Sequence, residues 1–306
     1  MKKVFVFGSI NMDLVIETET FPKIGESVFG ENFMTNQGGK GANQAVGSKK
    51  LGCETYFIGA VGNDSFGKDL IASLNSYGVD TTGVQVIDNV PSGTAMIITS
   101  KKERDNVIVV DLGTNNCIEP KKAISFLNEK ASKGDIFITQ LEGDVNTIEE
   151  VSHHAKEMGL YTVLNPAPAR LVSKSFISNF NLVIPNETET EKITGVTINS
   201  DEDAKKAFEV FKSMGVKELI ITLGGDGSVF VKDNYCEHFR SYSKEVVDTT
   251  SAGDTFIGAL CSRLSDGMTI EESIPFASRC AAITVSRRGA AKSIPTLEEV
   301  KKLFNL

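Results

Sequence analysis

The sequence predicts an α/β fold: a three-layer α/β/α sandwich with a mainly parallel central sheet and a small inserted β-sheet. Two observations predict it. Short apolar runs alternate with stretches of helical apolar spacing, which is typical of a parallel sheet covered on both faces. Two other segments contain few helix signals and alternate apolar with polar residues, as a half-exposed antiparallel sheet does. With 306 residues, the chain is long enough to bury a core without disulfide bonds.

The N-terminal part of the chain supplies the first strands and helices of the predicted core. The apolar run of residues 4–8 predicts a buried strand, because short continuous apolar runs are typical of strands covered on both faces. A helix is expected over about residues 41–51, followed by a strand over 55–62 and a helix over about 65–77. This order of strand and helix is the one that parallel strands require.

Further apolar runs predict the later strands of the core, at residues 135–140, 161–165, 181–185 and 218–224. The stretches between them carry apolar residues at helical spacing, as at Ala123, Ile124 and Leu127, and at Ala204, Ala207, Phe208 and Phe211. We expect two long apolar-rich helices to close the chain, over about 252–264 and 270–286.

Residues 12–36 and 92–113 interrupt this alternation, and we interpret them as a small sheet that forms a lid over the core. In this interpretation the chain is a single domain, whose α/β core spans approximately residues 1–11, 37–91 and 114–306. The alternative is that both segments add edge strands to the main sheet, and the sequence leaves it open.

Composition and charge exclude several classes of protein. The net charge of −8 argues against a general nucleic-acid binder, which needs a basic face for phosphates. The five cysteines are widely spaced and form no C-x-x-C pair, which disfavours disulfide and zinc frameworks and favours a reducing compartment. The N-terminal apolar run is too short for a signal peptide, and no uncharged stretch is long enough to span a membrane. We expect a cytoplasmic protein without nucleic-acid or membrane partners.

Two familiar nucleotide-binding patterns are missing or incomplete. Residues 62–69 have the G-x-x-x-x-G-K spacing of a phosphate-binding loop, but Asp69 stands where that loop needs a Ser or Thr hydroxyl for magnesium. A carboxylate there would repel phosphate, so we reject this motif. No G-x-G-x-x-G follows a predicted strand, so the dinucleotide fingerprint is absent as well.

The stretch VDTTSAGDTF, residues 247–256, carries the strongest sign of chemistry. Ala252, Gly253 and Asp254 form the first turn of a predicted helix, where amide groups are unpaired and the dipole is positive. Small residues there admit phosphate close to the backbone. Asp254 is placed to take a proton from an attacking hydroxyl while the amides stabilise a transferring phosphoryl group. The alternative is that Asp254 only complements the helix dipole.

Polar residues also follow several other predicted strands, where ligands bind in open α/β sheets. GSINMD and QLEG follow two strands, and GGKGANQAV opens a helix whose free amides and glycines let a substrate lie close. The candidate side chains are Asn11, Asp13, Lys40, Asn43 and Glu142. The alternative for GGKGANQAV is a glycine-rich turn with a solvated Lys40.

Two more motifs follow strands and have both a structural and a functional interpretation. The glycines of TLGGDG, residues 222–227, let the backbone approach a flat or anionic ligand, but the sequence is also a good turn. In PNETETEKITG, Asn186 and Glu189 fit a helix cap. They also fit a magnesium–phosphate site contacted through water, because that ion prefers hard oxygen ligands.

The motifs GSINMD, GGKGANQAV, NPAPA, PNETETEKITG, ITLG and DTTSAGDTF occur together in this order. In them the chain resembles the ribokinase branch of the PfkB family of carbohydrate kinases, from about residue 3 to residue 300. The resemblance implies a ribokinase-like fold and ATP-dependent phosphorylation of D-ribose at O5, which gives D-ribose 5-phosphate and leads ribose into the pentose phosphate pathway. It also implies Mg²⁺ with ATP, K⁺ as an activator, and a homodimer formed through the lid.

The resemblance also implies a role for each candidate residue. The sugar would be held by Asn11, Asp13, Gly38, Gly39, Lys40, Asn43 and Glu142, with Asp254 as the catalytic base beside it. An anion hole would consist of Ser251, Ala252 and Gly253. ATP would lie against Gly253 and Asp254 and would be bound by Asn186, Thr222, Leu223, Gly224, Gly225, Asp226, Gly227 and Ser278. Glu189 would contact Mg²⁺ through water, and K⁺ would be bound by Asp248, Thr250, Thr284, Arg287, Gly289 and Ser293.

The chain departs from the family pattern at two positions. Ser251 replaces the usual Gly or Ala of the anion-hole turn, and Ile257 replaces an Asn that is common in the next helix. Two alternatives to a ribose kinase stay open. One is a related kinase for another sugar or a nucleoside, although the chain has no Trp and only five Tyr to build a slot for a base. The other is a sugar-binding regulator without catalysis.

Overall fold

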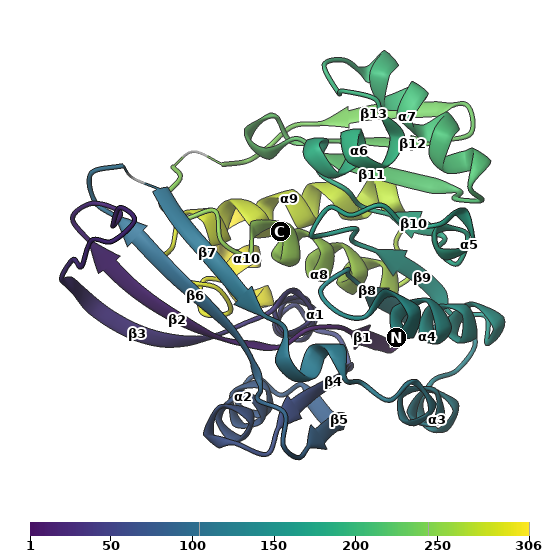
Figure 1. Cartoon of the computed structure of the whole chain (residues 1–306). Helices are drawn as coiled ribbons and strands as arrows, with labels where there is room; N and C mark the ends of the chain where they lie inside the picture. The colour runs from purple at the N-terminus through teal and green to yellow at the C-terminus, as the bar shows by residue number, and fades with distance from the viewer. Residues whose placement is uncertain (104, 244, 306) are drawn as a thin grey trace.

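A central nine-stranded sheet organises the molecule (Figure 1). The computed structural model describes residues 1–103, 105–243 and 245–305, so Arg104, inside the second predicted lid segment, lies outside the described residues. In spatial order the strands are β13 (Tyr235–Phe239), β12 (Ser228–Lys232), β11 (Glu218–Thr222), β10 (Leu182–Val183), β9 (Tyr161–Leu164), β8 (Ile136–Thr139), β1 (Val4–Phe7), β4 (Thr55–Gly62) and β5 (Asp80–Ile87). We call it the core sheet. All neighbours from β11 to β5 pair in parallel, and β11–β12–β13 is antiparallel. The predicted mainly parallel sheet is confirmed.

The core sheet is covered on both faces because its strands are apolar on both faces. In β1 all four side chains are buried, and they alternate between two hydrophobic clusters. Val4 and Val6 pack toward α1 (Lys40–Lys50), α2 (Ser65–Ser76), α8 (Ala252–Ser265), α9 (Ile270–Val285) and α10 (Leu297–Phe304). Phe5 and Phe7 pack toward α3 (Pro120–Lys130), α4 (Val145–Glu157), α5 (Lys174–Ile177), α6 (Glu187–Thr194) and α7 (Asp201–Ser213). The result is the predicted three-layer sandwich.

The predicted helices and core strands are present, but several elements were not predicted. They are the strand β5, the antiparallel hairpin β12–β13 and the helix α10, whereas α4 and α5 lie in stretches between strands for which helical spacing was predicted. Because α10 follows α9, the two long helices do not close the chain as expected. The hairpin strands have five residues each and sit at the sheet edge, where a short apolar run resembles a loop in sequence.

The two interrupting segments form a separate sheet, so the alternative of extra edge strands is wrong. The strand order is β3 (Gly30–Gly38), β2 (Asn11–Thr18), β6 (Gly93–Ser100) and β7 (Asp105–Asp111). We call it the small sheet, and it projects away from the core sheet (Figure 1). It is not wholly antiparallel, because β2 and β6 pair in parallel. Both strands follow parallel core strands, β1 and β5, and so they leave the core in the same direction.

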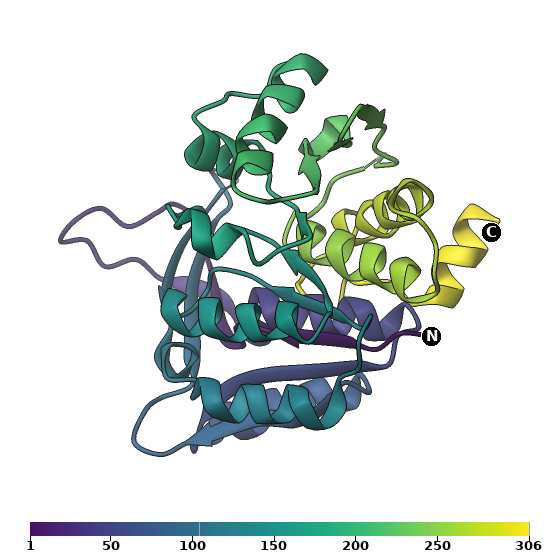
Figure 2. The ribbon, with the colours of Figure 1, turned by 90° about the vertical axis from the view of Figure 1, so that its right-hand side faces the viewer.

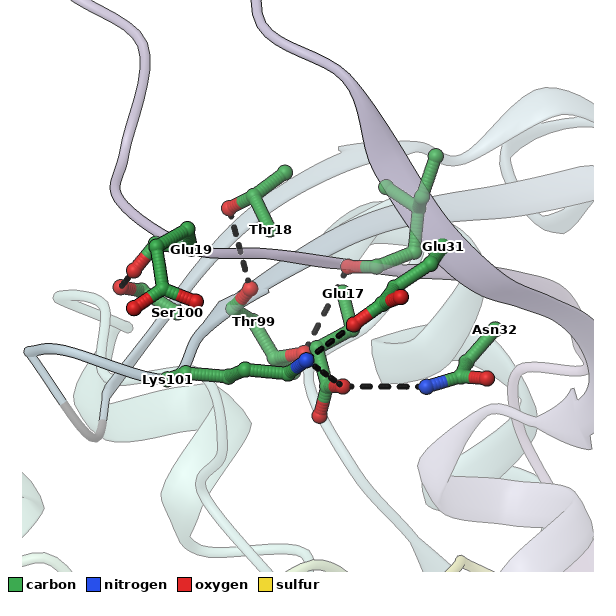
Figure 3. Close-up of polar contacts among 9 residues, drawn as sticks. Glu17, Thr18, Glu19, Glu31, Asn32, Thr99, Ser100 and Lys101 are labelled. Carbon is green, nitrogen blue, oxygen red and sulfur yellow. Dashed lines mark hydrogen bonds and ion pairs between the residues drawn. The ribbon is translucent and has the colours of Figure 1, made fainter.

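Polar contacts join the outer ends of the small sheet (Figure 3). Lys101 lies between Glu17 of β2 and Glu31 of β3, with its Nζ 3.4 Å from Glu17 Oε1. Asn32 Nδ2 donates to the same Glu17 oxygen at 3.0 Å. Exposed ion pairs of this kind contribute little to the free energy of folding. They help to align the strands, but they do not substitute for a hydrophobic core. The loop of residues 19–29 between β2 and β3 extends beyond the rest of the molecule (Figure 2).

None of the described helices is long and apolar enough to cross a membrane. All five cysteines are free, and three of them, Cys53, Cys261 and Cys280, are buried in the core.

Candidate active site

A cleft of about 440 Å³ lies between the carboxyl ends of the core strands and the small sheet. Its walls come from β2, β6 and β7, from the start of α1, from the loops after β8, β9 and β10, and from the first turn of α8. This is the place where ligands bind in open α/β sheets, because loops from several parallel strands meet at one edge.

The cleft brings together most of the predicted site residues. Those that line it are Asn11, Asp13, Gly39, Lys40, Asn43, Glu142, Asn186, Glu189, Thr222, Thr250, Ser251, Ala252, Gly253 and Asp254, together with Ile257. Gly38 adjoins it, since a Cβ there would lie 2.2 Å from the carboxylate oxygens of Asp13. The predicted residues outside its lining are Leu223, Gly224, Gly225, Asp226, Gly227, Asp248, Ser278, Thr284, Arg287, Gly289 and Ser293.

Asp254 stands in the first turn of α8 with both carboxylate oxygens hydrogen-bonded. Asn43 Nδ2 donates to Oδ2 at 3.2 Å, and Gln44 Nε2 donates to Oδ1 at 3.0 Å. Burial raises the pKa of Asp254, while the nearby Lys40 and the two amide donors act in the opposite direction. A buried carboxyl with a raised pKa is suited to accept a proton at neutral pH.

Lys40 is the cation of the cleft. Burial alone would lower its pKa, but the carboxylates of Asp254, Glu142 and Glu189 outweigh that effect and raise the pKa. Lys40 therefore stays charged at neutral pH. It lies at the first position of α1, where the positive end of the helix dipole also favours anions.

A pair of carboxylates faces the cleft from the other side. Burial, and next the charge of Glu142, raise the pKa of Asp13 to about 7. The Ser9 hydroxyl and the Lys40 amide donate to Glu142 Oε2 at 2.5 and 3.1 Å. Gly39 has a φ of 88°, and a Cβ there would lie 2.7 Å from Ile10 Cα, so only glycine lets α1 start this close to β2.

Ser251 lies against Asn43 at the edge of the cleft. It has a φ of 61°, a left-handed conformation that suits Gly better than Ser. Asn43 Nδ2 donates to Ser251 Oγ at 2.9 Å as well as to Asp254. The buried Oδ1 of Asn43 has no partner among the described residues. Asn43 therefore offers the cleft a hydrogen-bond acceptor.

The amides at the start of α8 are only partly engaged. Ala252 donates its amide to the Thr249 carbonyl at 3.2 Å, and Thr255 donates to the Ser251 carbonyl at 2.8 Å. Within the described residues the amides of Gly253 and Asp254 have no protein acceptor. Of the three residues of the predicted anion hole, Ala252 has an engaged amide, whereas the amides of Ser251 and Gly253 have no acceptor among the described residues.

Asn186 and Glu189 form the capping box that the sequence predicts at the start of α6. Glu189 accepts from the Asn186 backbone amide at 2.9 Å and from its Nδ2 at 3.1 Å. Both residues also line the cleft, so the cap and the functional interpretation are compatible. Burial raises the pKa of Glu189, and a cation in the cleft would relieve that cost. These hard oxygen donors fit Mg²⁺ bound through water, although the described residues contain no cluster of three His, Cys, Asp or Glu.

The glycine-rich stretch after β11 forms a turn. Residues Gly224–Asp226 form a short 3₁₀ helix after Thr222, which stands at the rim of the cleft. Gly227 has a φ of 99°, and a Cβ there would lie 2.0 Å from the Phe239 carbonyl oxygen. Its glycine is therefore required by the fold, and its contact with ATP stays a prediction.

The segments predicted to bind potassium lie together beside α8. Asp248 Oδ2 accepts from the Gly289 amide at 3.0 Å, and Oδ1 accepts from the Thr250 amide at 2.9 Å. The second bond caps the turn of residues 248–250, so Asp248 also has a structural role there. The side chain of Arg287 forms an ion pair with Glu299, with 3.0 Å between Arg287 Nη2 and Glu299 Oε1. Only the backbone of Arg287 is then available for the predicted ion.

Sequence reasoning missed three buried amides around Asp254, namely Gln44 and Gln140, which do not line the cleft, and Asn165, which does. It also missed the Asn115 side chain, which holds the Asn11 side chain and the Ile10 backbone. Gln140 and Asn165 directly follow the strands β8 and β9, whereas Gln44 lies in α1. Gln44 and Asn165 stand inside the motifs GGKGANQAV and NPAPA, but a Gln or Asn in a motif gives no sign of which group it contacts.

Comparisons with known proteins agree with this geometry. The family model described as pfkB family carbohydrate kinase matches residues 1–297. The chain is 36% identical over 298 residues to the ribokinase of Haemophilus influenzae, covering 97% of each chain. It is 30% identical over 304 residues to the deoxyribokinase of Salmonella typhi, covering 99% of each. Among solved structures, Arabidopsis thaliana ribokinase complexed with ribose and ATP matches with a TM-score of 0.91 at 29% identity, covering 100% of this chain and 99% of that one.

Proposed function

The chain belongs to the pfkB family of carbohydrate kinases, and within it we propose that this protein transfers the γ-phosphoryl group of ATP to O5 of D-ribose. One observation carries the proposal. Asp254 is a buried carboxylate held by two amide donors, in the same cleft as the Asp13–Glu142 pair. It lies at a helix start where the amides of Gly253 and of Asp254 itself have no acceptor among the described residues. A proton acceptor and an anion-binding turn then adjoin a site for hydroxyl groups.

The reaction needs one proton transfer and one displacement. As O5 of ribose attacks the γ-phosphorus, its proton passes to the carboxylate of Asp254, and the bond from the γ-phosphorus to the bridging oxygen of ADP breaks. The amide of Gly253 and the ammonium group of Lys40 stabilise the charge on the transferring group. Mg²⁺, held through water by Glu189 with Asn186 beside it, would neutralise charge on the phosphates when bound.

Sugar binding is assigned to acceptors on the other wall of the cleft. Asp13 and Glu142 accept hydrogen bonds from ribose hydroxyls, and the unpartnered Oδ1 of Asn43 accepts another. Ile97, Ile108 and Val110 of the small sheet supply an apolar cover above them. This cover supports a role of the small sheet as a lid that excludes water from the phosphoryl group.

The small sheet is also proposed as the interface of a homodimer. It exposes large apolar side chains, among them Phe33, Met34, Met96, Val107 and Val109. Exposed apolar groups gathered on one sheet are typical of an interaction surface. Sedimentation should show a dimer that Val109→Lys dissociates. Val86→Lys, at an exposed valine of β5, is the matched control and should leave the dimer intact. A wild-type monomer at micromolar concentration would contradict the proposal.

A potassium ion beside α8 is the last part of the proposal. Asp248 and the carbonyls of its loop and of residues 284–293 supply the oxygen set that large monovalent ions favour. The ion would fix the turn at Gly253. Initial rates should rise several-fold in potassium over sodium at equal ionic strength, and Asp248→Ala should remove most of that difference. Equal rates in potassium, sodium and a bulky organic cation would argue against the site.

A substrate panel with ATP tests the reaction itself. ADP release should be fastest with D-ribose, and 2-deoxyribose, fructose and nucleosides should be poorer acceptors. A faster rate with one of these would assign the enzyme to that acceptor, and sugar binding without ADP release would identify a regulator. A cytoplasmic location is proposed from the five free cysteines, and fractionation of cells that express the chain tests it.

A further inference from the structure

Three buried amide side chains form a chain of hydrogen bonds that reaches Asp254; two of them lie outside the cleft lining, and the third, Asn165, is part of it. Gln140 follows β8, Gln44 is in α1, and Asn165 follows β9. Their exposed fractions are 1%, 0% and 8%. Gln140 Nε2 donates to Gln44 Oε1 at 2.6 Å, and Gln44 Nε2 donates to Asn165 Oδ1 at 3.2 Å and to Asp254 Oδ1 at 3.0 Å.

The direction of the hydrogen bonds that Gln44 donates is fixed by Asn165 and by the carboxylate of Asp254. Asn165 Nδ2 donates to the Ile184 carbonyl at 3.1 Å, so its Oδ1 is the end that faces Gln44. Gln44 Oε1 receives the amide of Gln140, so its Nε2 must point at Asp254 and Asn165. An amide nitrogen has two hydrogens and no acceptor, and both hydrogens of Gln44 are thus used. Gln44 can only donate to Asp254.

The surrounding backbone leaves room for this arrangement. A Cβ at Gly8 would lie 2.0 Å from Gln140 Oε1, so the glycine at the end of β1 makes the space that Gln140 occupies. Buried amides are costly unless they are hydrogen-bonded. Here their bonds link α1, α8 and the ends of β8 and β9, and the Oε1 of Gln140 is the one atom of the three amide groups without a partner among the described residues. An apolar filling of the same space would leave one oxygen of Asp254 without a donor.

We infer that Gln44 is a positioning residue for the carboxylate of Asp254, which it orients and keeps in the proton-accepting form. The inference rests on the proposed phosphoryl transfer. Gln44 does not line the cleft, so it acts only through Asp254. Asn43 bonds the other carboxylate oxygen and faces the proposed sugar site. Asn43 therefore serves sugar recognition, and Gln44 serves only the orientation of Asp254.

The charges around Asp254 set the direction of the expected effect. Lys40 of α1 favours the ionised carboxylate, whereas Glu142 after β8 and Glu189 of α6 disfavour it. Asp13 of β2 also lines the cleft, where the charge of Glu142 acts on it. A hydrogen bond to the charged form also favours ionisation. Loss of the Gln44 donor therefore raises the pKa of Asp254 further, and the acid limb of the rate profile moves to higher pH.

The test compares Gln44→Met, which keeps the volume without the donor, and Gln44→Glu, which adds a second carboxyl group. The matched control is Gln85→Met. Gln85 is also a buried glutamine with two hydrogen bonds, but it lies in β5 and bonds Glu119. Three quantities are measured: the pH profile of kcat/KM for ribose, the melting temperature, and the titration of Asp254 in ¹³C-aspartate-labelled free protein. The signal is assigned by its loss in Asp254→Asn.

For Gln44→Met we expect the acid limb and the Asp254 titration to move up by about one pH unit. Turnover at neutral pH should fall by about 10- to 100-fold, as misplacement of a reacting group does. Gln44→Glu should move both further, because a second carboxyl opposes ionisation. Gln85→Met should lower the melting temperature without moving either.

An unchanged Asp254 titration in Gln44→Met would overturn the inference, even if the variant is less stable or less active. If both Gln44 variants fail to fold, Gln140→Met removes the anchor of Gln44, and a smaller shift in the same direction is expected. No shift there would overturn the inference too. The titration is measured without substrate, so it stands apart from the proposed function, which fails if the wild type phosphorylates no sugar.

Discussion

The core sheet and the small sheet use apolar residues in opposite ways. In β1 and β8 every side chain is buried between two helix layers. In β7 every residue is exposed, although its sequence DNVIVVD is nearly as apolar. A strand in the core gains its stability from packing within the chain. Burial of one Val or Ile side chain is worth about 1.5–3 kcal/mol, and the small sheet leaves most of this unused.

This difference separates two tasks in the cleft. The core holds the charged groups at fixed positions, with Asp254 and its amide partners nearly or fully buried. The small sheet contributes Asp13 and Asn11 only at its base, where β2 leaves β1, and otherwise offers an apolar cover. We therefore expect chemistry to depend on the core side and closure and sugar affinity to depend on the small-sheet side.

The largest effect is expected on the core side, at Asp254. Asp254→Asn keeps the size and loses the proton acceptor, so turnover should fall by roughly 10²–10⁴-fold, the usual worth of general acid–base catalysis. The same variant should raise the melting temperature at neutral pH. Burial raises the pKa of Asp254 in the folded state, so folding favours the uncharged carboxyl. At neutral pH the folded wild type must hold the ionised carboxylate, which lowers its stability, and the uncharged Asn removes this cost.

Asp69→Asn, at an exposed aspartate of α2, is the control for Asp254→Asn and should change neither quantity. Turnover of Asp254→Asn within threefold of the wild type would show that the core does not supply the proton acceptor.

The next effect is expected at Asp13, on the small-sheet side. In Asp13→Ala a ribose hydroxyl in the buried site would lose its acceptor, which costs about 1–3 kcal/mol of binding free energy. Calorimetry should therefore show weaker ribose binding by that amount and little change in ATP binding. Because the pKa of Asp13 is about 7 and ribose hydroxyls donate to its ionised form, wild-type ribose affinity should fall below pH 7. Glu17→Ala, farther along β2, is the control. Equal loss of both ligands in Asp13→Ala would indicate a folding defect instead.

Amide hydrogen exchange compares the two sheets directly. Residues 12–36 and 92–113 should exchange faster than the core strands, because fewer of their side chains are buried. Ribose at ten times its dissociation constant should slow them by about tenfold, the stabilisation that such an excess of ligand supplies. If ribose does not slow amide exchange in either segment, the small sheet does not act as a lid.

The smallest effect is expected at Ser251, where the core meets the sugar. Ser251→Ala removes the hydroxyl that accepts from Asn43 Nδ2, and one neutral hydrogen bond is worth about 0.5–1.5 kcal/mol. The KM for ribose should rise a few-fold while the KM for ATP stays the same. Ser262→Ala, at a buried serine of the same helix, is the control. A larger effect on ATP than on ribose would place the hydroxyl on the nucleotide side.

The sequence by itself determined the fold class and most of the cleft. Apolar runs at Val4–Phe7 and Ile136–Thr139 are continuous because both faces of those strands are buried, and this pattern can be detected locally. The motif residues Asp13, Lys40, Asn43 and Asp254 were predicted from strand ends and helix starts, since parallel strands bring their carboxyl ends to one edge of the sheet.

Only the tertiary structure decided what each of these groups contacts. The bond from Gln44 to Asp254 joins residues 210 positions apart. Both neighbouring amides bond Asp254, and no local pattern encodes that Asn43 also lines the cleft whereas Gln44 does not. The exposure of β7 was likewise decided by placement, because a strand takes its buried or exposed state from what packs against it. Periodicity is a local property of the chain, whereas burial, hydrogen-bond partners and shifted pKa values arise from groups brought together by folding.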